Sequence, residues 1–314
     1  GYITLNRNEG TICFINRLTH EKKTIDYYDL GRKLDNAVSK ISLLGGYHPK
    51  DGPGYLRATT DHCLVFAPPL GSTYRKDGEY ASYNIATEEV RAVEKSEYCY
   101  SDSLFLKGCT HGDWVIGCSD HRICIRDLTT DEVKSIECQE PYTYLWLTPM
   151  GFIRACDVGE GEDEHTELYR YDSSSGSEVQ INGLPEDLFL CLLSGLSLIY
   201  RNGNAYLFTN DHYGQIQIYK FSCTEPNPVA ELILEETFDM HCCIGVYNQY
   251  VVVNNDEEVG LIDLEHGTYS VLHSDGTRDV CLIGNFLYYR TQEDESPYRL
   301  DLSNISSGET RVKL

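Results

Sequence analysis

Residues 113–127, with the sequence DWVIGCSDHRICIRD, decide the fold of this 314-residue chain. Two short apolar segments, Asp113–Cys118 and Arg122–Leu128, alternate in polarity and are separated by polar turn residues. The apolar segment Ser103–Cys109 precedes them, and Val133–Cys138 follows after another polar turn. Short alternating segments between Gly, Asp and Ser residues are typical of β-strands joined by tight turns. This part of the chain therefore predicts a unit of four antiparallel strands.

The same plan returns along the chain at intervals of about 45 residues. Residues 239–275 and 278–314 repeat it most clearly, and each unit has a strand that ends near an Asp or a polar substitute. The residues at these strand ends are Asp29, Asn84, Asp127, Asp172, Lys220, Asp263 and Asp301. Units of this length with four short strands are typical of β-propeller blades.

The predicted fold is all-β: a seven-bladed β-propeller of four-stranded antiparallel blades, in a single domain that spans residues 1–314. One such sheet cannot bury its two apolar faces alone, so neighbouring sheets have to cover them. The approximate blades are residues 1–40, 41–96, 97–139, 140–183, 184–238, 239–276 and 277–314. We interpret Tyr28–Leu44, the best helical candidate, as a loop followed by a strand. Tyr2–Arg7 either completes the last blade or begins the first.

Two of the units resemble WD repeats. Asp120–Asp127 (DHRICIRD) and Asp256–Asp263 (DEEVGLID) are similar to the Asp-x-x-Ile-x-Ile-Trp-Asp core of that family, with Arg126 and Ile262 at the Trp position. The Gly-His dipeptide of the family is missing. The chain thus resembles a divergent WD-repeat propeller. This resemblance implies a non-catalytic scaffold or adaptor that binds a peptide or a partner domain on one face of the propeller.

Composition narrows the partners and the compartment. A formal net charge of −23 argues against direct binding to nucleic acid and could attract a basic protein partner. The 13 cysteines lie mostly on predicted strands and do not form the disulfide framework of a small secreted module, which favours the cytoplasm or nucleus. The longest apolar segment, Leu188–Tyr200, is too short and interrupted to span a membrane, so no membrane partner is expected.

The candidate binding residues come from long loops and from one aromatic strand. The loops Gly45–Thr60 and Ala67–Tyr80 are rich in Pro and Tyr, and loops of this kind often carry the binding residues of a fold. Aromatic residues that alternate along residues 142–146 share one side of a strand, and such residues are frequent in binding interfaces. The resulting set is Tyr47, Tyr55, Tyr74, Arg126, Tyr142, Tyr144 and Trp146.

Arg126 has two possible roles. At the surface it could bind an acidic group, whereas in the core it would need a carboxylate such as Asp120 or Asp127 as its partner.

We expect no catalytic residue, no metal site and no cofactor. The zinc-like residue types between residues 109 and 124 lie on strands whose side chains alternate in direction, so they do not converge on one ion; they are Cys109, His111, Cys118, His121 and Cys124. Two alternatives to a scaffold stay open. One is an enzyme or small-molecule binder that uses the central channel, with titratable residues such as His62, Asp102 and His241. The other is a propeller component of a larger multi-domain complex.

Overall fold

A computed structural model describes residues 2–6, 10–15, 21–38, 55–59, 62–67, 80–93, 110–119, 122–130, 132–137, 144–159, 165–186, 188–190, 197–210, 216–236, 242–255, 257–274, 276–291, 297–307 and 312–313. The chain divides into two compact units, Gly1–Asp157 with Tyr169–Glu178 and Val158–Leu168 with Val179–Leu314. None of the described helices is long and apolar enough to cross a membrane.

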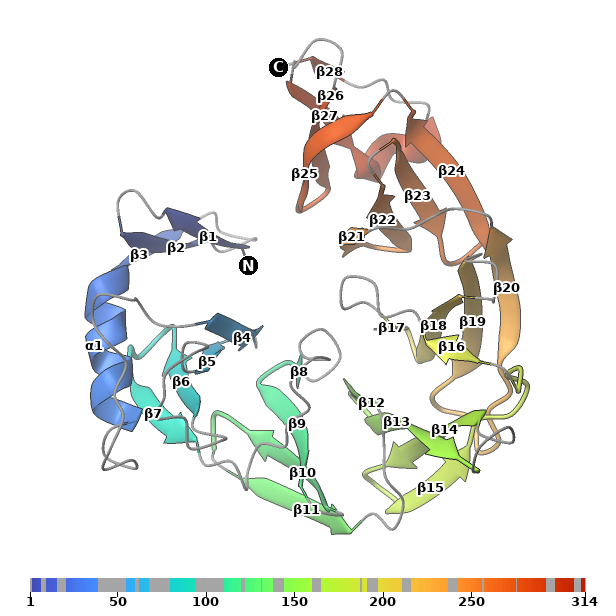
Figure 1. The fold of residues 1–314 in the computed structure, drawn as a ribbon, viewed down its shortest axis with the longest axis horizontal. Coiled ribbons are helices and arrows are strands. Elements are labelled where there is room, and N and C mark those ends of the chain that lie inside the picture. The colour runs from blue at the N-terminus through green and yellow to red at the C-terminus, as the bar shows by residue number, and fades with distance from the viewer. Residues whose placement is uncertain are drawn as a thin grey trace. The chain divides into compact units, whose positions relative to one another are not determined.

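The first unit is built from consecutive antiparallel sheets (Figure 1). The first sheet contains β1 (Tyr2–Asn6), β2 (Thr11–Ile15) and β3 (Lys22–Asp26), followed by helix α1 (Tyr27–Val38). The second sheet contains β4 (Tyr55–Thr59), β5 (Cys63–Ala67), β6 (Tyr80–Asn84) and β7 (Val90–Val93). The third sheet contains β8 (Thr110–His111), β9 (Trp114–Ser119), β10 (Arg122–Asp127) and β11 (Val133–Glu137). The fourth sheet contains β12 (Tyr144–Thr148), β13 (Gly151–Val158), β14 (His165–Asp172) and β15 (Ser177–Gln180), and the middle of this sheet carries the boundary between the units.

The second unit continues the same plan. The fifth sheet contains β16 (Phe189–Leu190), β17 (Leu198–Arg201), β18 (Asn204–Asn210), β19 (Ile216–Ser222) and β20 (Glu231–Glu236), and both β16 and β17 pair with β18. The sixth sheet contains β21 (Cys242–Tyr247), β22 (Tyr250–Asn254), β23 (Val259–Asp263) and β24 (Thr268–His273). The seventh sheet contains β25 (Thr277–Ile283), β26 (Phe286–Thr291), β27 (Pro297–Asp301) and β28 (Val312–Lys313), with a short 3-10 helix at Leu302–Ser307.

The recurring strand-end residue closes a turn by accepting backbone hydrogen bonds. In the third sheet, Oδ1 of Asp127 accepts from the N–H groups of Thr129 and Thr130, at 2.7 and 3.4 Å. Leu128, the residue directly after Asp127, donates its backbone N–H to the carbonyl of Asp113 in the neighbouring turn, at 2.9 Å. This side-chain turn explains why Asp and Asn recur at this position, because their oxygen can reach the backbone two and three residues ahead.

The same arrangement holds at other strand ends. It is made by Asn84, Asp172, Asp263 and Asp301, as the sequence predicted, and in the fifth sheet by the hydroxyl of Ser222. The prediction of Lys220 for the fifth unit is therefore wrong by two residues, since a Ser hydroxyl supplies the acceptor there.

The prediction that Tyr28–Leu44 is a loop followed by a strand is also wrong. The third strand of the first sheet ends at Asp26, and Oδ1 of Asp26 accepts from the N–H of Asp29 at 2.7 Å. This bond caps the first turn of α1. An Asp therefore starts a helix here, whereas at the ends of other strands an Asp closes a turn that leads to the next strand. Asp29, which the sequence suggested as the strand end, lies inside the helix.

The strand β1 belongs to the first sheet, where Tyr2 to Asn6 pair with Ile15 to Thr11 of β2. Core side chains join consecutive sheets. In the first unit, Leu30 of α1 packs with residues of the first two sheets, and Ile123 packs with Phe152 across the third and fourth sheets. In the second unit, two further clusters join the fifth sheet to the sixth and the sixth to the seventh.

Candidate ligand site between the third and fourth sheets

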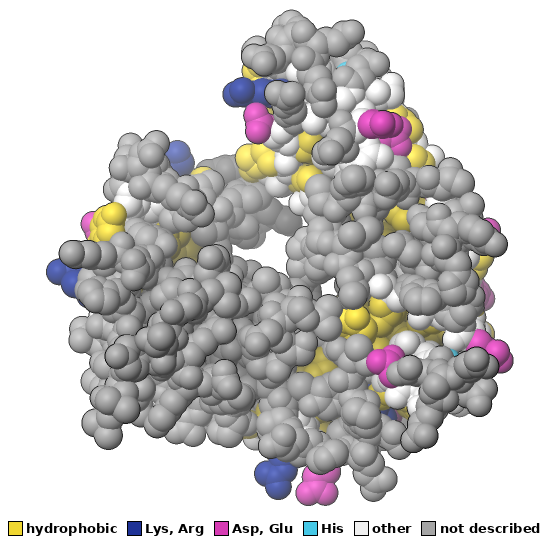
Figure 2. Space-filling model, in the orientation of Figure 1, with side chains coloured by type: hydrophobic (Ala, Val, Ile, Leu, Met, Phe, Trp, Pro, Cys, Tyr) yellow, Lys and Arg dark blue, Asp and Glu magenta, His cyan; other side chains and the backbone are white. Residues whose placement is uncertain are grey.

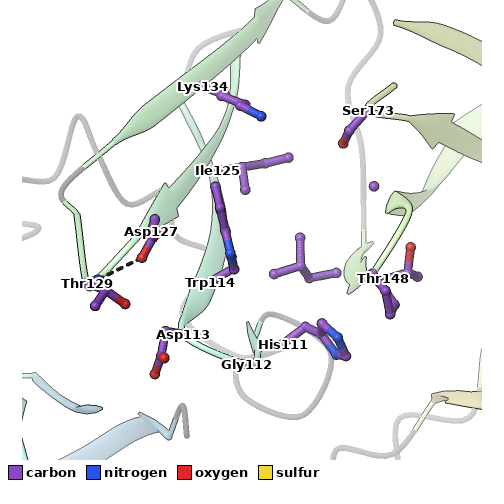
Figure 3. A pocket seen from close by; sticks show the side chains of 13 residues that line it. His111, Gly112, Asp113, Trp114, Ile125, Asp127, Thr129, Lys134, Thr148 and Ser173 are labelled. Atoms are coloured by element: carbon purple, nitrogen blue, oxygen red, sulfur yellow. Dashed lines mark hydrogen bonds between the residues drawn. The ribbon is translucent and has the colours of Figure 1, made fainter. Parts of the chain in front are cut away.

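A pocket of about 600 Å³ lies within the first unit, where hairpin turns of the third and fourth sheets meet (Figure 3). It is lined by His111, Gly112, Asp113, Trp114, Ile125, Asp127, Thr129, Lys134, Leu147, Thr148, Pro149, Gly151 and Ser173. The lining thus combines apolar side chains with an ammonium group, carboxylates and hydroxyls. Pockets of this size and composition are typical of sites for small molecules.

The register of the third sheet gathers one wall of the pocket on a single face. Trp114 of β9 lies opposite His111 of β8 and opposite Asp127 of β10. One step along the sheet, Ile125 lies opposite Lys134 of β11. Directly opposed residues in an antiparallel sheet point to the same side, and so do residues two apart on one strand. Four neighbouring strands therefore bring these five side chains together.

Lys134 and Asp127 give the pocket two opposite charges that do not pair with each other. The ammonium nitrogen of Lys134 lies 5.6 Å from the ring centroid of Trp114, a cation–π distance, and among the described residues it makes no ion pair. Burial opposes the ionisation of Asp127, but the hydrogen bonds from Thr129 and Thr130 outweigh it and lower the pKa of this carboxyl. The side chain of Asp127 is therefore an anion at neutral pH, and its Oδ1 accepts the backbone bonds of the turn.

Asp113 is bound to a histidine of the second sheet. Its Oδ1 accepts from the backbone N–H of His62 at 2.9 Å, and its Oδ2 lies 2.5 Å from Nδ1 of the same residue. The imidazole of His62 is exposed, so Asp113 fixes its orientation and leaves Nε2 directed away from the bond. A carboxylate-oriented imidazole is a common proton-transfer group in enzymes.

The fourth sheet supplies the facing wall. Leu147, Pro149 and Gly151 come from β12, β13 and the turn between them, and Thr148 and Ser173 add two hydroxyls. Figure 3 shows Thr148 and Ser173 on the other side of the pocket from Asp127. The rings of Phe152 and Tyr171 stack with centroids 4.7 Å apart. Both residues belong to the same apolar cluster as the lining residues Ile125 and Leu147.

Three residues of the predicted binding set lie beside the pocket without lining it. Arg126 is only 6% exposed, and it follows Ile125 on β10, so it points to the opposite face of the sheet. Its suggested partner Asp127 faces the pocket instead. Trp146 is 3% exposed and stacks on Tyr144, with ring centroids 5.8 Å apart. These two aromatic residues lie on the face of β12 opposite to the lining residue Leu147.

The other predicted residues fall on parts of the chain that are not described. Tyr47, Tyr74 and Tyr142 lie outside the described residues, as do Asp120, Asp102 and His241. Tyr55 lies on β4, and its side chain is not described. Of the zinc-like residues, Cys109 and His121 are also outside, and no three described His, Cys, Asp or Glu side chains form a metal-binding group.

Sequence reasoning missed the pocket, although several of its residues stand in the stretch that decides the fold. Trp114 and Asp127 are thirteen positions apart, and only the hairpin register places them opposite each other. A register count from the two apolar segments Asp113–Cys118 and Arg122–Leu128 could have found this pair. Nothing in the sequence pattern marks Ser173 or Thr148, because they belong to a different sheet.

No protein-family model matches this chain, and no curated protein matches it in sequence. Solved structures do resemble it. A dipeptidyl peptidase 4 from Porphyromonas gingivalis is 11% identical, with a TM-score of 0.51 over 99% of this chain and 52% of that one. An acylaminoacyl peptidase from Pyrococcus horikoshii is 11% identical, with a TM-score of 0.50 over 83% of this chain and 45% of that one. The dihydro-heme d1 dehydrogenase NirN, in complex with DHE, is 12% identical, with a TM-score of 0.50 over 100% of this chain and 66% of that one.

These likenesses establish the fold alone. They are to β-propeller proteins, so the predicted all-β propeller is confirmed, while nothing in them is specific to WD repeats. This chain spans about half the length of the first of these proteins. The expectation of a non-catalytic scaffold or adaptor is contradicted, because the three similar structures described above are two peptidases and a dehydrogenase.

Proposed function

We propose that this chain is the propeller part of an enzyme, and that it binds a small-molecule substrate in the pocket between the third and fourth sheets. The observation that supports this proposal is the pocket itself, a cavity of about 600 Å³ whose lining combines apolar side chains with charged groups and hydroxyls. Propeller enzymes among the similar structures favour the same choice over a scaffold.

The residues have separate roles in this proposal. Trp114, Ile125 and Leu147 provide the apolar surface on which a substrate lies. Lys134 and Asp127 orient its polar groups through charge-assisted hydrogen bonds. His62, which is held by the lining residue Asp113, is the group that we propose for proton transfer.

The test is an incubation of the chain with a cell metabolite extract, followed by mass spectrometry. Metabolites retained with the protein after gel filtration report binding, and metabolites consumed over time report turnover. We expect retention of a compound that is lost in Lys134→Met and kept in the control Lys220→Met, which changes a lysine of β19 in the other unit. Consumption should disappear in His62→Gln while retention persists.

Two results would contradict the proposal. Retention without any consumption would show a binding protein and remove the enzymatic part. Neither retention nor consumption, or equal losses in Lys134→Met and Lys220→Met, would remove the pocket as the site.

We also propose that the blades are of divergent WD type. In support, Asp127 and Asp263, which end the two WD-like segments, both close turns at the end of the third strand of a sheet. Replacing Arg126 by Trp introduces the residue usual in that family. An unchanged melting temperature would favour the WD interpretation, and a chain that no longer folds would contradict it.

A further inference from the structure

We infer that the pocket between the third and fourth sheets binds a zwitterion: a free amino acid or a short peptide with both charged termini and an apolar side chain. This inference rests on the proposed function and names the class of ligand for the same site. It follows from the charges of the lining, from the face of the sheet on which they lie and from the apolar residues that line the same pocket.

The charge balance of the pocket favours a ligand that is neutral overall but carries both charges. Lys134 provides an ammonium group that makes no ion pair with any described residue. Asp127 provides a carboxylate that binds the backbone of its own turn through Oδ1 and makes no ion pair with any described cation. The third charged group, Asp113, is already bound by His62. One open positive charge and one open negative charge remain.

The two open charges lie on the same face of the third sheet but do not neutralise each other. Lys134 is on β11 opposite Ile125, and Asp127 follows two residues later on β10, so both side chains project to the same side. A ligand carboxylate at Lys134 and a ligand ammonium group at Asp127 would each form a charge-assisted hydrogen bond. A ligand with only a negative charge would meet Asp127, and one with only a positive charge would meet Lys134.

The space beside these charges is suited to an apolar side chain. Ile125 and Leu147 line the pocket above a core that includes Ile116 and Phe152. The hydroxyls of Thr148 and Ser173 stand on the far wall and could bind a peptide group or solvent. A volume of about 600 Å³ accommodates either an amino acid or a short peptide.

The chain contains its own reporter for this site. It has two tryptophans, and Trp114 lines the pocket whereas Trp146 is buried against Tyr144. The variant Trp146→Phe leaves Trp114 as the single tryptophan, so its fluorescence reports occupancy of the pocket. Calorimetric titration of the unmodified chain provides a second readout that does not depend on this variant.

The experiment compares ligands that differ in charge but not in side chain. Leucine and leucyl-leucine carry both charges, N-acetyl-leucine carries only the negative charge, and leucine methyl ester carries only the positive charge. We expect a zwitterion to bind about tenfold more tightly than either blocked form, since a hydrogen bond to a charged group typically contributes this much. Tighter binding of leucine than of leucyl-leucine would identify a free amino acid as the ligand, and the reverse would identify a peptide.

Two variants test the assignment of each charge. Asp127→Asn keeps the turn, because Asn84 makes the same two backbone bonds at 2.9 Å in the second sheet. This variant should abolish the preference for leucine over N-acetyl-leucine and keep the preference over the ester. Lys134→Met should do the opposite. The control Asp263→Asn changes the corresponding turn of the sixth sheet and should alter neither preference.

The failure of this inference can be told apart from the failure of the proposed function. If the metabolite extract yields a retained compound that Lys134→Met loses, but leucine, leucyl-leucine and their phenylalanine counterparts bind no better than the blocked forms, the pocket is a ligand site and the zwitterion inference is wrong. If Asp127→Asn and Lys134→Met weaken every ligand equally, the assignment of the charges is wrong as well. If no compound of any class binds, the proposed function fails with it.

Discussion

At the scale of single residues, the aspartates that end strands act through ionised carboxylates. Oδ1 of Asp172 accepts hydrogen bonds from the hydroxyl and the N–H of Ser174, at 2.6 and 2.7 Å, and from the N–H of Ser175 at 3.3 Å. These bonds, first those of Ser174, lower the pKa of Asp172. A lowered folded-state pKa stabilises the protein above the pKa of the unfolded chain, and the stabilisation is lost as the pH falls through the folded-state value.

We therefore expect Asp172→Asn to reduce the loss of stability in acid. The amide keeps an acceptor oxygen for the turn but does not titrate, so the difference in urea midpoint between about pH 7 and about pH 3 should be smaller than in the unmodified chain. The control is Glu231→Gln, a change at an exposed residue of β20. If both variants behaved alike, the turn carboxylate would not be a source of acid sensitivity.

Gly267 provides a second prediction at this scale. Its φ is +61°, and a Cβ added there would lie 2.2 Å from the carbonyl oxygen of Ile233. Gly112 has a similar φ of +57°, but a Cβ there would meet no described atom within 4 Å. Both Ala variants carry the cost of a left-handed backbone, about 1 kcal/mol, and only Gly267→Ala adds a clash.

We expect Gly267→Ala to unfold at a clearly lower urea concentration than Gly112→Ala. Equal midpoints would mean that the chain around Ile233 moves aside at little cost. The comparison isolates the effect of space, because the two positions share the same backbone conformation.

At the scale of elements, the start of α1 depends on one side chain. Asp26 caps the first turn of the helix. Further along the helix, the ammonium nitrogen of Lys33 lies 3.6 Å from a carboxylate oxygen of Asp29 and 3.5 Å from one of Glu88, which follows β6. Asp26→Ala should lower the free energy of unfolding by about 1 kcal/mol, because the cap is lost. Asp26→Ser retains an acceptor oxygen for the cap, so its free energy of unfolding should be close to that of the unmodified chain. Thermal unfolding of both variants checks this, and equal losses would show that the charge of Asp26, and not its cap, stabilises the helix.

The strands could be predicted from the sequence, and the helix could not. The predicted segments Arg122–Leu128 and Val133–Cys138 are strands whose ends differ from the prediction by one residue. An Asp precedes α1, and in the other sheets an Asp precedes the turn between two strands. The repeat therefore predicted a strand where the helix lies. Ser222 escaped recognition for a related reason, since a hydroxyl does in the fifth sheet what a carboxylate does in others.

The site was less predictable than the fold because it depends on pairs of strands and sheets. Alternation places Ile125 and Asp127 on one side of β10, but it does not say which side faces a pocket. That depends on the neighbouring sheet, whose Leu147 and Ser173 complete the lining. Tyr144 and Trp146 are a second example. Alternation places both side chains on one side of the strand, but only the structure shows that they stack on each other and that Trp146 is buried.

At the scale of the whole molecule, the net charge of −23 predicts a response to salt. Figure 2 shows acidic side chains of described residues at separate places on the visible face. Repulsion among such charges destabilises a compact chain and is screened as the Debye length falls, from about 20 Å near 0.02 M salt to a few ångström near 0.5 M. The melting temperature should therefore rise over this range of sodium chloride, measured by calorimetry. A neutral osmolyte at matched osmolality is the control, and a falling melting temperature would show that attractive ion pairs dominate.

The first sheet ends without a fourth strand among the described residues, because the chain turns into α1 after Asp26. Among the described strands, β3 pairs only with β2, so no described strand lies along its other side. Such a border is a template on which a second copy could add a strand and begin to aggregate. β3 has only five residues and begins with the exposed Lys22, and a short border with a lysine resists this addition. The short border strand of the three-stranded first sheet thus limits self-association of the chain at high concentration.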